Sequence, residues 1–287
     1  MTAPLIPEEG MYWEAPAKIN LDVRVRPPRG DGMHPIRSHA QTITHCDLVR
    51  FESAEEDRLV VKGSDLEANA DNLVTSALAG IRGNSTVPPV SIELTKNIPH
   101  RAGLGGGSSD AAAVIRALMG NGDDAQAVAA AVGADVSFFL DGGLCLMEGI
   151  GERVSQLDVI DGYAVAVVMP GYGLTTADVY ARWDELHFPE GTPVDGPGIP
   201  PGLRELGPLV NDLVPAAVSL RPDLGDWMAD LDRRWGRPVL MSGSGSACFA
   251  FFADIDEAAS ALDEVESSDG FVATPRPFGV ASWIRNG

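Results

Sequence analysis

One stretch, residues 90–118, combines a strand pattern, a cluster of glycines and a helix pattern, and it constrains the fold more than any other part of the chain. Apolar and polar residues alternate from Val90 to Leu94, which is the period-two pattern of a half-buried strand. The segment Gly103–Gly107 then has four glycines in five positions. An alanine-rich run follows, with apolar residues at helical spacing through Leu118. The stretch therefore predicts a strand, a glycine loop and a helix, in that order.

This order favours a phosphate group as ligand. Glycines lack a Cβ, so several backbone N–H groups can point at one anion, and a helix N-terminus adds unpaired amides and a positive dipole end. The loop does not match GxxxxGK[ST], because no lysine follows the glycines, or GxGxxG, because Ser108 or Asp110 takes the place of the last glycine. The alternative is helix capping by Ser108, with Asp110 in the first turn, but capping does not account for the glycines.

Charge excludes several classes of partner. The 287 residues, enough for one large or two modest domains, carry 41 acidic and 21 basic side chains and a net charge of −20. Such a field repels nucleic acids and anionic membranes, so an anionic substrate has to be held by locally placed amides and cations. We therefore expect a small-molecule substrate, with no nucleic acid and no membrane as partner.

Cysteine usage and the first residues indicate a cytoplasmic protein. Cys46, Cys145 and Cys248 are far apart and show no CxxC spacing, so we expect neither a disulfide framework nor a thiolate metal site. The opening MTAPLIPEEG lacks a basic region followed by an apolar core, and no apolar run approaches the length of a membrane span.

The glycine loop carries a family resemblance. PHRAGLGGGSSDAAA, residues 99–113, resembles the ATP loop of the GHMP kinase superfamily, which includes galactokinase, homoserine kinase and mevalonate kinase. Its triple-glycine form is most similar to that of the 4-diphosphocytidyl-2-C-methyl-D-erythritol kinases. The resemblance implies an ATP site formed by Lys96, Pro99, Gly103, Leu104, Gly105, Gly106, Gly107, Ser108 and Ser109. It also implies Mg²⁺ as a cofactor, with Ser109 helping to place the metal. For Lys96, the solvent face of a strand end is the alternative.

Two further motifs resemble the substrate site of the same kinases. The alternation from Ile19 to Val25 predicts a strand with Lys18 at its start. PAKIN, residues 16–20, and DGMH, residues 31–34, look like the family motif PAKxN…DGYH. The match implies that Lys18 and Asn20 face the acceptor hydroxyl and that His34 contacts the cytosine. Without it, Lys18 reads as a solvated charge and His34 as the polar tip of a turn.

One position departs from the family pattern. The family carries an aromatic residue before that histidine, where it stacks on the cytosine, and this chain has Met33. A thioether on a ring face is attractive but orients the ring less than an aromatic stack does. Tyr180, on a helix expected over residues 176–186, occupies a position where relatives carry an aromatic that closes over the cytosine. Core packing is the alternative for Tyr180.

A carboxylate completes the implied chemistry. GADVSFFL, residues 133–140, resembles the family motif GADVPFF, whose Asp is the catalytic carboxylate; helix capping by Asp135 is the alternative. Phosphoryl transfer needs a carboxylate that accepts or orients the proton of the attacking alcohol, and a nearby lysine keeps it ionised and offsets developing charge. The resemblance therefore implies Asp135 and Lys18 as the catalytic pair.

A second glycine loop lies between two predicted strands. MSGSGSACF, residues 241–249, resembles the third GHMP motif, which packs against the ATP loop and borders the acceptor, so Gly243 and Ser244 are implied as substrate contacts. A tight hairpin is the alternative. Asn72, in a segment similar to one beside the adenine, and Asn211, in a family-like NDL segment, are both sufficiently explained as helix caps.

Together the motifs imply an α/β (α+β) fold with two lobes, a ribosomal S5 domain 2-like N-terminal lobe (1–158) and a ferredoxin-like C-terminal lobe (159–287), with the active site between them. The Pro/Gly-rich segment 187–202 predicts an extended surface loop. The implied activity is ATP-dependent phosphorylation of the 2-hydroxyl of 4-diphosphocytidyl-2-C-methyl-D-erythritol in the non-mevalonate isoprenoid pathway, by a monomer or homodimer. A GHMP kinase for homoserine or a sugar, and a non-catalytic nucleotide-binding regulator, remain alternatives.

Overall fold

The structure, a computed structural model, describes residues 11–69, 72–265 and 270–284. Its larger sheet runs in the order β12-β1-β3-β5-β4, with β2 and β6 also paired to β3 and β7 paired to β6. Every pairing in it is antiparallel except β4 with β5. The strands are β1 (Met11–Asn20), β2 (Arg24–Val25), β3 (Ile36–Ser53), β4 (Arg58–Lys62), β5 (Val90–Thr95), β6 (Leu144–Gly149), β7 (Arg153–Gln156) and β12 (Ala281–Ile284).

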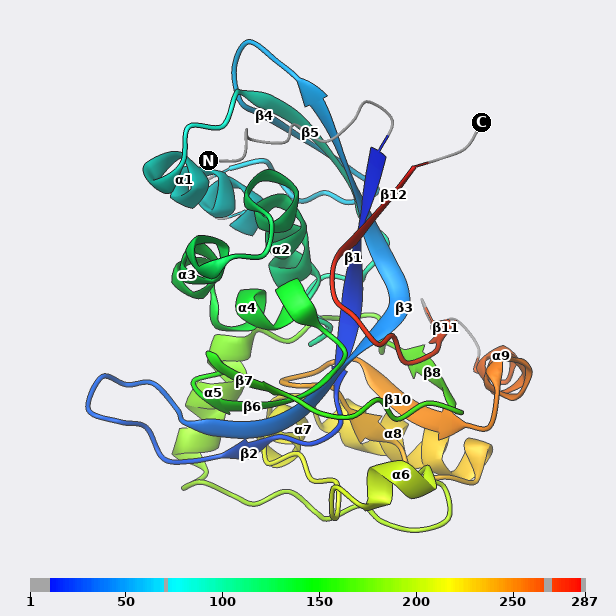
Figure 1. Cartoon of the computed structure of the whole chain (residues 1–287). Helices are drawn as coiled ribbons and strands as arrows, with labels where there is room; N and C mark the ends of the chain where they lie inside the picture. Colours follow the sequence, from blue (N-terminus) through cyan, green and yellow to red (C-terminus); the bar gives the residue numbers. More distant parts are fainter. Residues whose placement is uncertain (1–10, 70–71, 266–269, 285–287) are drawn as a thin grey trace.

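Helices α1 (Leu73–Asn84), α2 (Gly106–Met119), α3 (Asp123–Val132) and α4 (Ala134–Asp141) gather on one side of this sheet (Figure 1). The α2 helix lies between the sheet and the other three helices, and most of its residues are buried. Three consecutive alanines, Ala111–Ala113, are fully buried there. Their small side chains let α2 approach its neighbours closely, which brings the start of the helix up to β1.

The smaller sheet is antiparallel and runs in the order β11-β8-β10-β9. Its strands are β8 (Ala164–Val168), β9 (Leu240–Met241), β10 (Cys248–Phe252) and β11 (Phe271–Ala273). Every residue of β8 and β10 is buried, because both faces of this sheet are covered. One face packs in a cluster with α5 (Thr176–Glu185), α7 (Val214–Leu220), α8 (Pro222–Trp235) and α9 (Ile255–Asp263).

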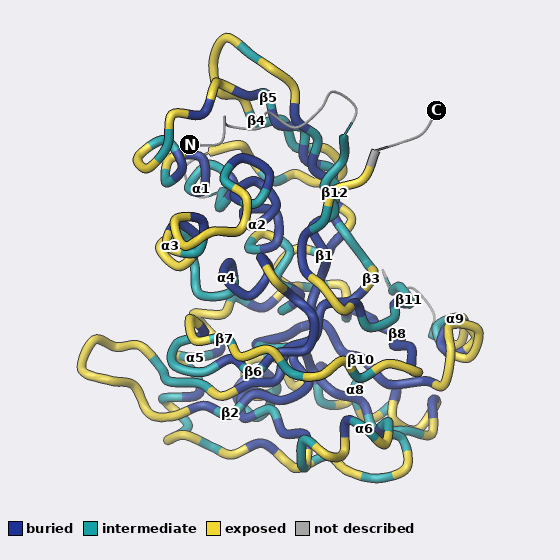
Figure 2. The backbone as a smooth tube through the Cα atoms, in the orientation of Figure 1, coloured by how far each residue is buried: buried dark blue, intermediate teal, exposed yellow. Residues whose placement is uncertain are grey.

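The other face of the smaller sheet joins the two parts of the molecule. Val165 and Phe249 from this sheet share a buried cluster with Ile19 of β1 and Ile43 of β3. Figure 2 shows buried backbone continuing between the two sheets, whereas the connection from β2 to β3 is exposed. The boundary expected near residue 158 falls between β7 and β8, and β12 returns to pair with β1 in the larger sheet.

Most strands and helices expected from periodicity are confirmed, and the differences have physical causes. Lys18 lies near the end of β1 and not at its start, because residues 11–17 pair with β3 and β12 although they do not alternate. The segment 187–202 is anchored more firmly than a surface loop: Ile199 is 2% exposed, and Val194 pairs with Leu209 ahead of α6 (Pro201–Arg204). Neither β7 nor α8 was expected.

Within the described ranges, no helix has both the length and the apolar character that crossing a bilayer would require.

Candidate active site

The glycine loop turns directly into α2. Gly103 and Gly105 have φ values of 76° and 73°, the left-handed region that favours glycine. Gly105 is the N-cap of α2, so the helix begins at Gly106 and the expected cap at Ser108 is wrong. The reason is that the left-handed residue lets the backbone enter the helix before the serines. A Cβ on Gly105 would lie 2.7 Å from the Phe139 ring, and one on Gly103 would lie 2.1 Å from the carbonyl oxygen of Ser242.

Lys18, Asn20 and Asp135 come together beside this loop. The Lys18 ammonium donates to Oδ1 of Asn20 and lies 3.9 Å from Oδ2 of Asp135. Lys18 is only 5% exposed, so the reading of a solvated surface charge is wrong. Its backbone N–H also donates to the carbonyl of Leu104 in the glycine loop. Burial lowers the pKa of Lys18, and the Asp135 carboxylate opposes that effect.

Asp135 is a residue of the first turn of α4 and not its cap, because Gly133 takes the capping position. The expectation that capping accounts for Asp135 is therefore wrong. Its side chain is 36% exposed, which leaves the carboxylate reachable by a substrate hydroxyl.

The second glycine loop lies against the same group. A Cβ on Gly243, whose φ is 57°, would stand 3.0 Å from Oδ1 of Asn20 and 3.4 Å from Nζ of Lys18. The neighbouring Ser244 has its hydroxyl 3.0 Å from that of Thr176 at the start of α5. The structure therefore places Gly243 beside Lys18 and Asn20, and its neighbour Ser242 beside Gly103 of the first glycine loop.

Ser242, which was not expected as a site residue, and Asn211, which was expected only as a helix cap, hold these loops together. The Ser242 hydroxyl accepts from the backbone N–H of Asn20 at 3.2 Å and donates to the carbonyl of Gly103 at 2.9 Å. Asn211 donates from its amide to the carbonyls of Met241 and Gly243 at 2.9 and 2.8 Å. Asn211 also accepts from the N–H of Leu213 at 2.9 Å, but α7 begins at Val214 with Leu213 as its N-cap, so the expected cap at Asn211 is wrong. Ser242 stood inside the quoted motif, and its position next to Gly243 was the available signal.

An aromatic cluster lies near Asp135. The His34 ring lies 5.0 Å from the Tyr180 ring and 5.8 Å from the ring of Trp183. Nε2 of His34 is 2.9 Å from the carboxylate of Asp184, so His34 is more than the tip of a turn. Burial, and then the nearby Asp135 charge, raise the pKa of Tyr180. Met33 is 46% exposed at the tip of the preceding turn.

Lys96 lies beneath the glycine loop. Its ammonium bonds to the carboxylates of Asp47 and Asp110, and it is 8% exposed, so the solvent-face reading is wrong. Burial acts to lower the pKa of Lys96, but the two carboxylates outweigh it and the pKa is raised. Burial, joined by the Asp47 charge, raises the pKa of Asp110 well above its usual range despite the lysine. A Cβ on Gly106 would lie 3.2 Å from Nζ of Lys96.

The remaining loop residues differ in access. Ser108 is half-buried and Gly107 is exposed, whereas Ser109 is fully buried. The Ser109 hydroxyl has no hydrogen-bond partner among the described residues, and that unsatisfied oxygen fits a role toward a metal ion. No cluster of three or more His, Cys, Asp or Glu side chains suited to a metal occurs in the described part of the chain.

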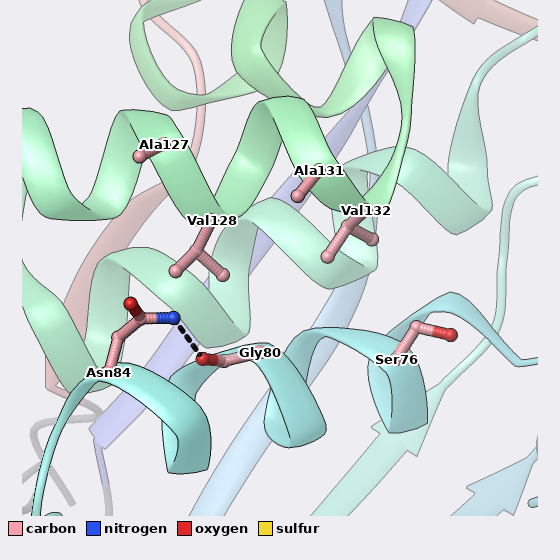
Figure 3. A pocket seen from close by; sticks show the side chains of 7 residues that line it. All are labelled: Ser76, Gly80, Asn84, Ala127, Val128, Ala131 and Val132. Carbon is pink, nitrogen blue, oxygen red and sulfur yellow. Dashed lines mark hydrogen bonds between the residues drawn. The ribbon is translucent and has the colours of Figure 1, made fainter.

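The sequence offers Asp71 or Asn72 as the cap of the helix that follows them. Asn72 caps α1, with Oδ1 accepting from the N–H of Val74 at 3.0 Å, and Asp71 lies outside the described residues. A groove of about 340 Å³ separates α1 from α3 (Figure 3). Its lining has no charged side chain and consists of Ser76, Gly80, Asn84, Ala127, Val128, Ala131 and Val132. The groove therefore offers no cation to a phosphate, and Lys18, Asn20 and Asp135 are not among the residues that line it.

Comparison with known proteins defines the class first. Residues 72–143 match the family described as GHMP kinases N terminal domain. The solved structure of a homoserine kinase from Cytophaga hutchinsonii superimposes with a TM-score of 0.67 at 19% identity, covering 98% of this chain and all of that one. The chain has the two-lobed α/β fold of the GHMP kinases.

The particular family follows from the more similar relatives. The 4-diphosphocytidyl-2-C-methyl-D-erythritol kinase of Mesorhizobium japonicum is 36% identical, covering 92% of this chain and 95% of that protein. The corresponding protein of Carboxydothermus hydrogenoformans is 34% identical, covering 85% and 89%. A crystal structure of 4-(cytidine 5'-diphospho)-2C-methyl-D-erythritol kinase superimposes with a TM-score of 0.74 at 33% identity, covering 92% and 98%. The chain belongs to this family of small-molecule kinases.

Proposed function

We propose that this chain transfers the γ-phosphoryl group of ATP to the 2-hydroxyl of 4-diphosphocytidyl-2-C-methyl-D-erythritol, giving the 2-phosphate and ADP. The observation that carries the proposal is the Lys18–Asp135 pair at 3.9 Å, beside a left-handed glycine loop, in a member of this kinase family. A non-catalytic regulator has no need for a buried lysine held against a partly exposed carboxylate.

In this proposal Asp135 accepts the proton of the attacking hydroxyl. Its partial exposure leaves room for the alcohol, and a carboxylate in hydrogen-bond reach of the hydroxyl can act as the general base. Lys18 then offsets the negative charge that spreads over the transferred phosphoryl group. Because Lys18 is buried, its charge is screened less by water than a surface lysine would be.

ATP would bind with its phosphates at the residues from Gly103 to Ser109. This is supported by the backbone, because the two left-handed glycines and the N-terminus of α2 present amides without side chains in the way. Mg²⁺, when bound with ATP, would neutralise phosphate charge, and Ser109 is the residue proposed to help hold it. Lys96 would act on this site through the position of the loop, since both its partners are protein carboxylates.

The cytosine would bind at the aromatic cluster. His34 and Tyr180 present adjacent rings, and Tyr180 lies near enough to Asp135 to sense its charge. The proximity of Tyr180 to Asp135 supports a single site, with the cytosine at one end and the reacting hydroxyl of the substrate at the other. Met33, exposed in the turn, would contribute a thioether contact in place of a stacked ring.

We also propose a cytoplasmic location and a division between lobes near residue 158. Cys46, Cys145 and Cys248 are all free, which suits a reducing compartment. The division falls where the chain passes from β7 to β8.

Coupled ADP release with purified protein, ATP and Mg²⁺ tests the function. Three acceptors are compared: the diphosphocytidyl compound, the methylerythritol phosphate that lacks CMP, and homoserine. We expect turnover with the first alone. Turnover with another alcohol and none with the first would retain a GHMP kinase but overturn the assigned acceptor, and ATP binding without any turnover would indicate a regulator.

A further inference from the structure

A chain of buried hydrogen bonds runs away from the catalytic lysine into the protein. Lys18 donates to Oδ1 of Asn20, and Nδ2 of Asn20 donates to the hydroxyl of Ser38 at 2.8 Å. The Ser38 hydroxyl in turn donates to the backbone carbonyl of Asp22 at 2.5 Å. Ser38 is fully buried and Asn20 is 7% exposed, so water competes little for these bonds. The chain therefore connects the site to the junction of β1 and β3.

The direction of each bond in this chain is determined by chemistry. A serine hydroxyl has one proton, and that of Ser38 is directed to the Asp22 carbonyl, which can only accept. Toward Asn20 the hydroxyl can then only accept, so the amide must present its NH₂ to Ser38 and its oxygen to Lys18. The lysine ammonium has donors only and requires that same orientation.

The far end of the chain is rigid for a separate reason. β1 ends at Asn20, and beyond it the Asp22 carboxylate accepts from the backbone N–H of His39 at 2.6 Å. Nδ1 of His39 lies 2.8 Å from the same carboxylate. The backbone N–H of Leu21 also donates to the His39 carbonyl at 2.8 Å. The Asp22 carbonyl, which accepts the hydrogen bond from Ser38, therefore lies in a short segment that bonds to His39 on both sides.

We propose that Ser38 is a positioning residue for phosphoryl transfer: its hydroxyl orients the Asn20 amide, and the Asn20 oxygen holds the Lys18 ammonium toward Asp135. This inference rests on the function proposed above. Without the hydroxyl, the buried NH₂ of Asn20 loses its acceptor, and the amide is free to rotate its oxygen away from Lys18. Ser38 itself touches neither Lys18 nor either glycine loop through any of its hydrogen bonds.

A readout that needs no substrate tests the orientation directly. The chain has only three lysines, Lys18, Lys62 and Lys96, so lysine labelled at the ε-carbon gives three NMR signals, and a Lys18→Arg variant assigns the first. Asp135 is the charged group that faces Lys18, and Asp22 and His39 pair with each other at the far end. An amide oxygen stabilises the ammonium, so its loss in Ser38→Ala lowers the pKa of Lys18.

Kinetics give the second readout. We expect kcat of Ser38→Ala to fall by about tenfold, the order expected when one hydrogen bond to a charged group is lost, with KM for ATP unchanged. The high-pH limb of the kcat/KM profile moves to lower pH, and Ser38→Thr, which keeps the hydroxyl, restores both values. Thr42→Val is the control, because Thr42 is also fully buried on β3 and its hydroxyl bonds to the carbonyls of Arg276 and Phe278 and to the N–H of Gly143. It reports the general effect of losing buried hydroxyl bonds, at least as many as Ser38 makes, and leaves the Lys18 titration in place.

The outcomes separate the two proposals. No turnover by the wild type overturns the proposed function, whereas the Lys18 titration still tests the hydrogen-bond chain. A wild type that turns over, with Ser38→Ala showing an unchanged Lys18 pKa and unchanged kcat, overturns the role of Ser38. Equal loss in Ser38→Ala and Thr42→Val, without a shift in the Lys18 titration, also overturns it, because only stability would then be affected.

Discussion

Replacing Asp135 by Asn removes the proposed base while keeping the size and shape of the side chain. For two unit charges 3.9 Å apart, an effective dielectric constant of about 20 gives an attraction of about 4 kcal/mol. Because the Asp135 side chain is 36% exposed, water screens the attraction between the two charges and reduces it to about 2 kcal/mol. Its loss lowers the pKa of Lys18, because Asp135 is the charge that opposes the effect of burial.

The rate effect is larger than the electrostatic one, because an amide cannot accept the hydroxyl proton. A positioned general base contributes about 10²–10⁴-fold, so we expect kcat of Asp135→Asn to fall by about that factor. Coupled ADP release measures kcat, and titration calorimetry measures ATP affinity, which we expect to stay within about threefold since Asp135 lies outside the glycine loop.

Asp141→Asn provides the matched control, since it makes the same change at the exposed last residue of the same helix. We expect it to retain wild-type kcat. Thermal unfolding checks that both variants are folded. A folded Asp135→Asn protein with wild-type kcat would remove Asp135 from the mechanism and refute the argument from the Lys18 pair.

Three further substitutions test the buried ion pairs of Lys96, the conformation of the glycine loop and the ion pair between Arg82 and Asp57. Lys96→Met leaves two buried aspartates without their cation and should lower the free energy of unfolding in urea by about 3–5 kcal/mol; the exposed Lys62→Met should change it little. Gly105→Ala places a Cβ against an aromatic ring at a left-handed φ and should raise KM for ATP, unlike Gly83→Ala in α1, whose Cβ meets nothing within 4 Å. A hydrogen bond from an arginine lowers the pKa of Asp57, so Asp57→Asn should be less stable than wild type at neutral pH, and the difference should vanish as pH falls through that depressed pKa. Equal stability of the two proteins at neutral pH would contradict this.

Local sequence predicted those parts of the site whose requirements are local. A glycine at positive φ is needed wherever the backbone turns tightly, and the loop at Gly103 and Gly105 shows that need directly. The alternation of residues 90–94 likewise matches the burial of β5. Capping was correctly expected at Asn72, where one side chain and one N–H decide the outcome.

Capping failed at Ser108 and Asp135 because the neighbouring glycines took the capping positions. The alternative that Lys96 lies on the solvent face of a strand end was wrong for another reason. Its two partners come from β3 and α2, 49 and 14 residues away, and no local sequence pattern predicts that these residues come into contact.

The sequence by itself determined the family, the two glycine loops and the residue types that the chemistry needs, because each depends on a short run of neighbouring residues. Only the tertiary structure decided which of them meet. Ser242 bridges Asn20 and Gly103 across 222 and 139 residues, and Ser38 reaches Lys18 only through the amide of Asn20. The physical reason is that hydrogen bonds act over about 3 Å in space, without regard to separation along the chain.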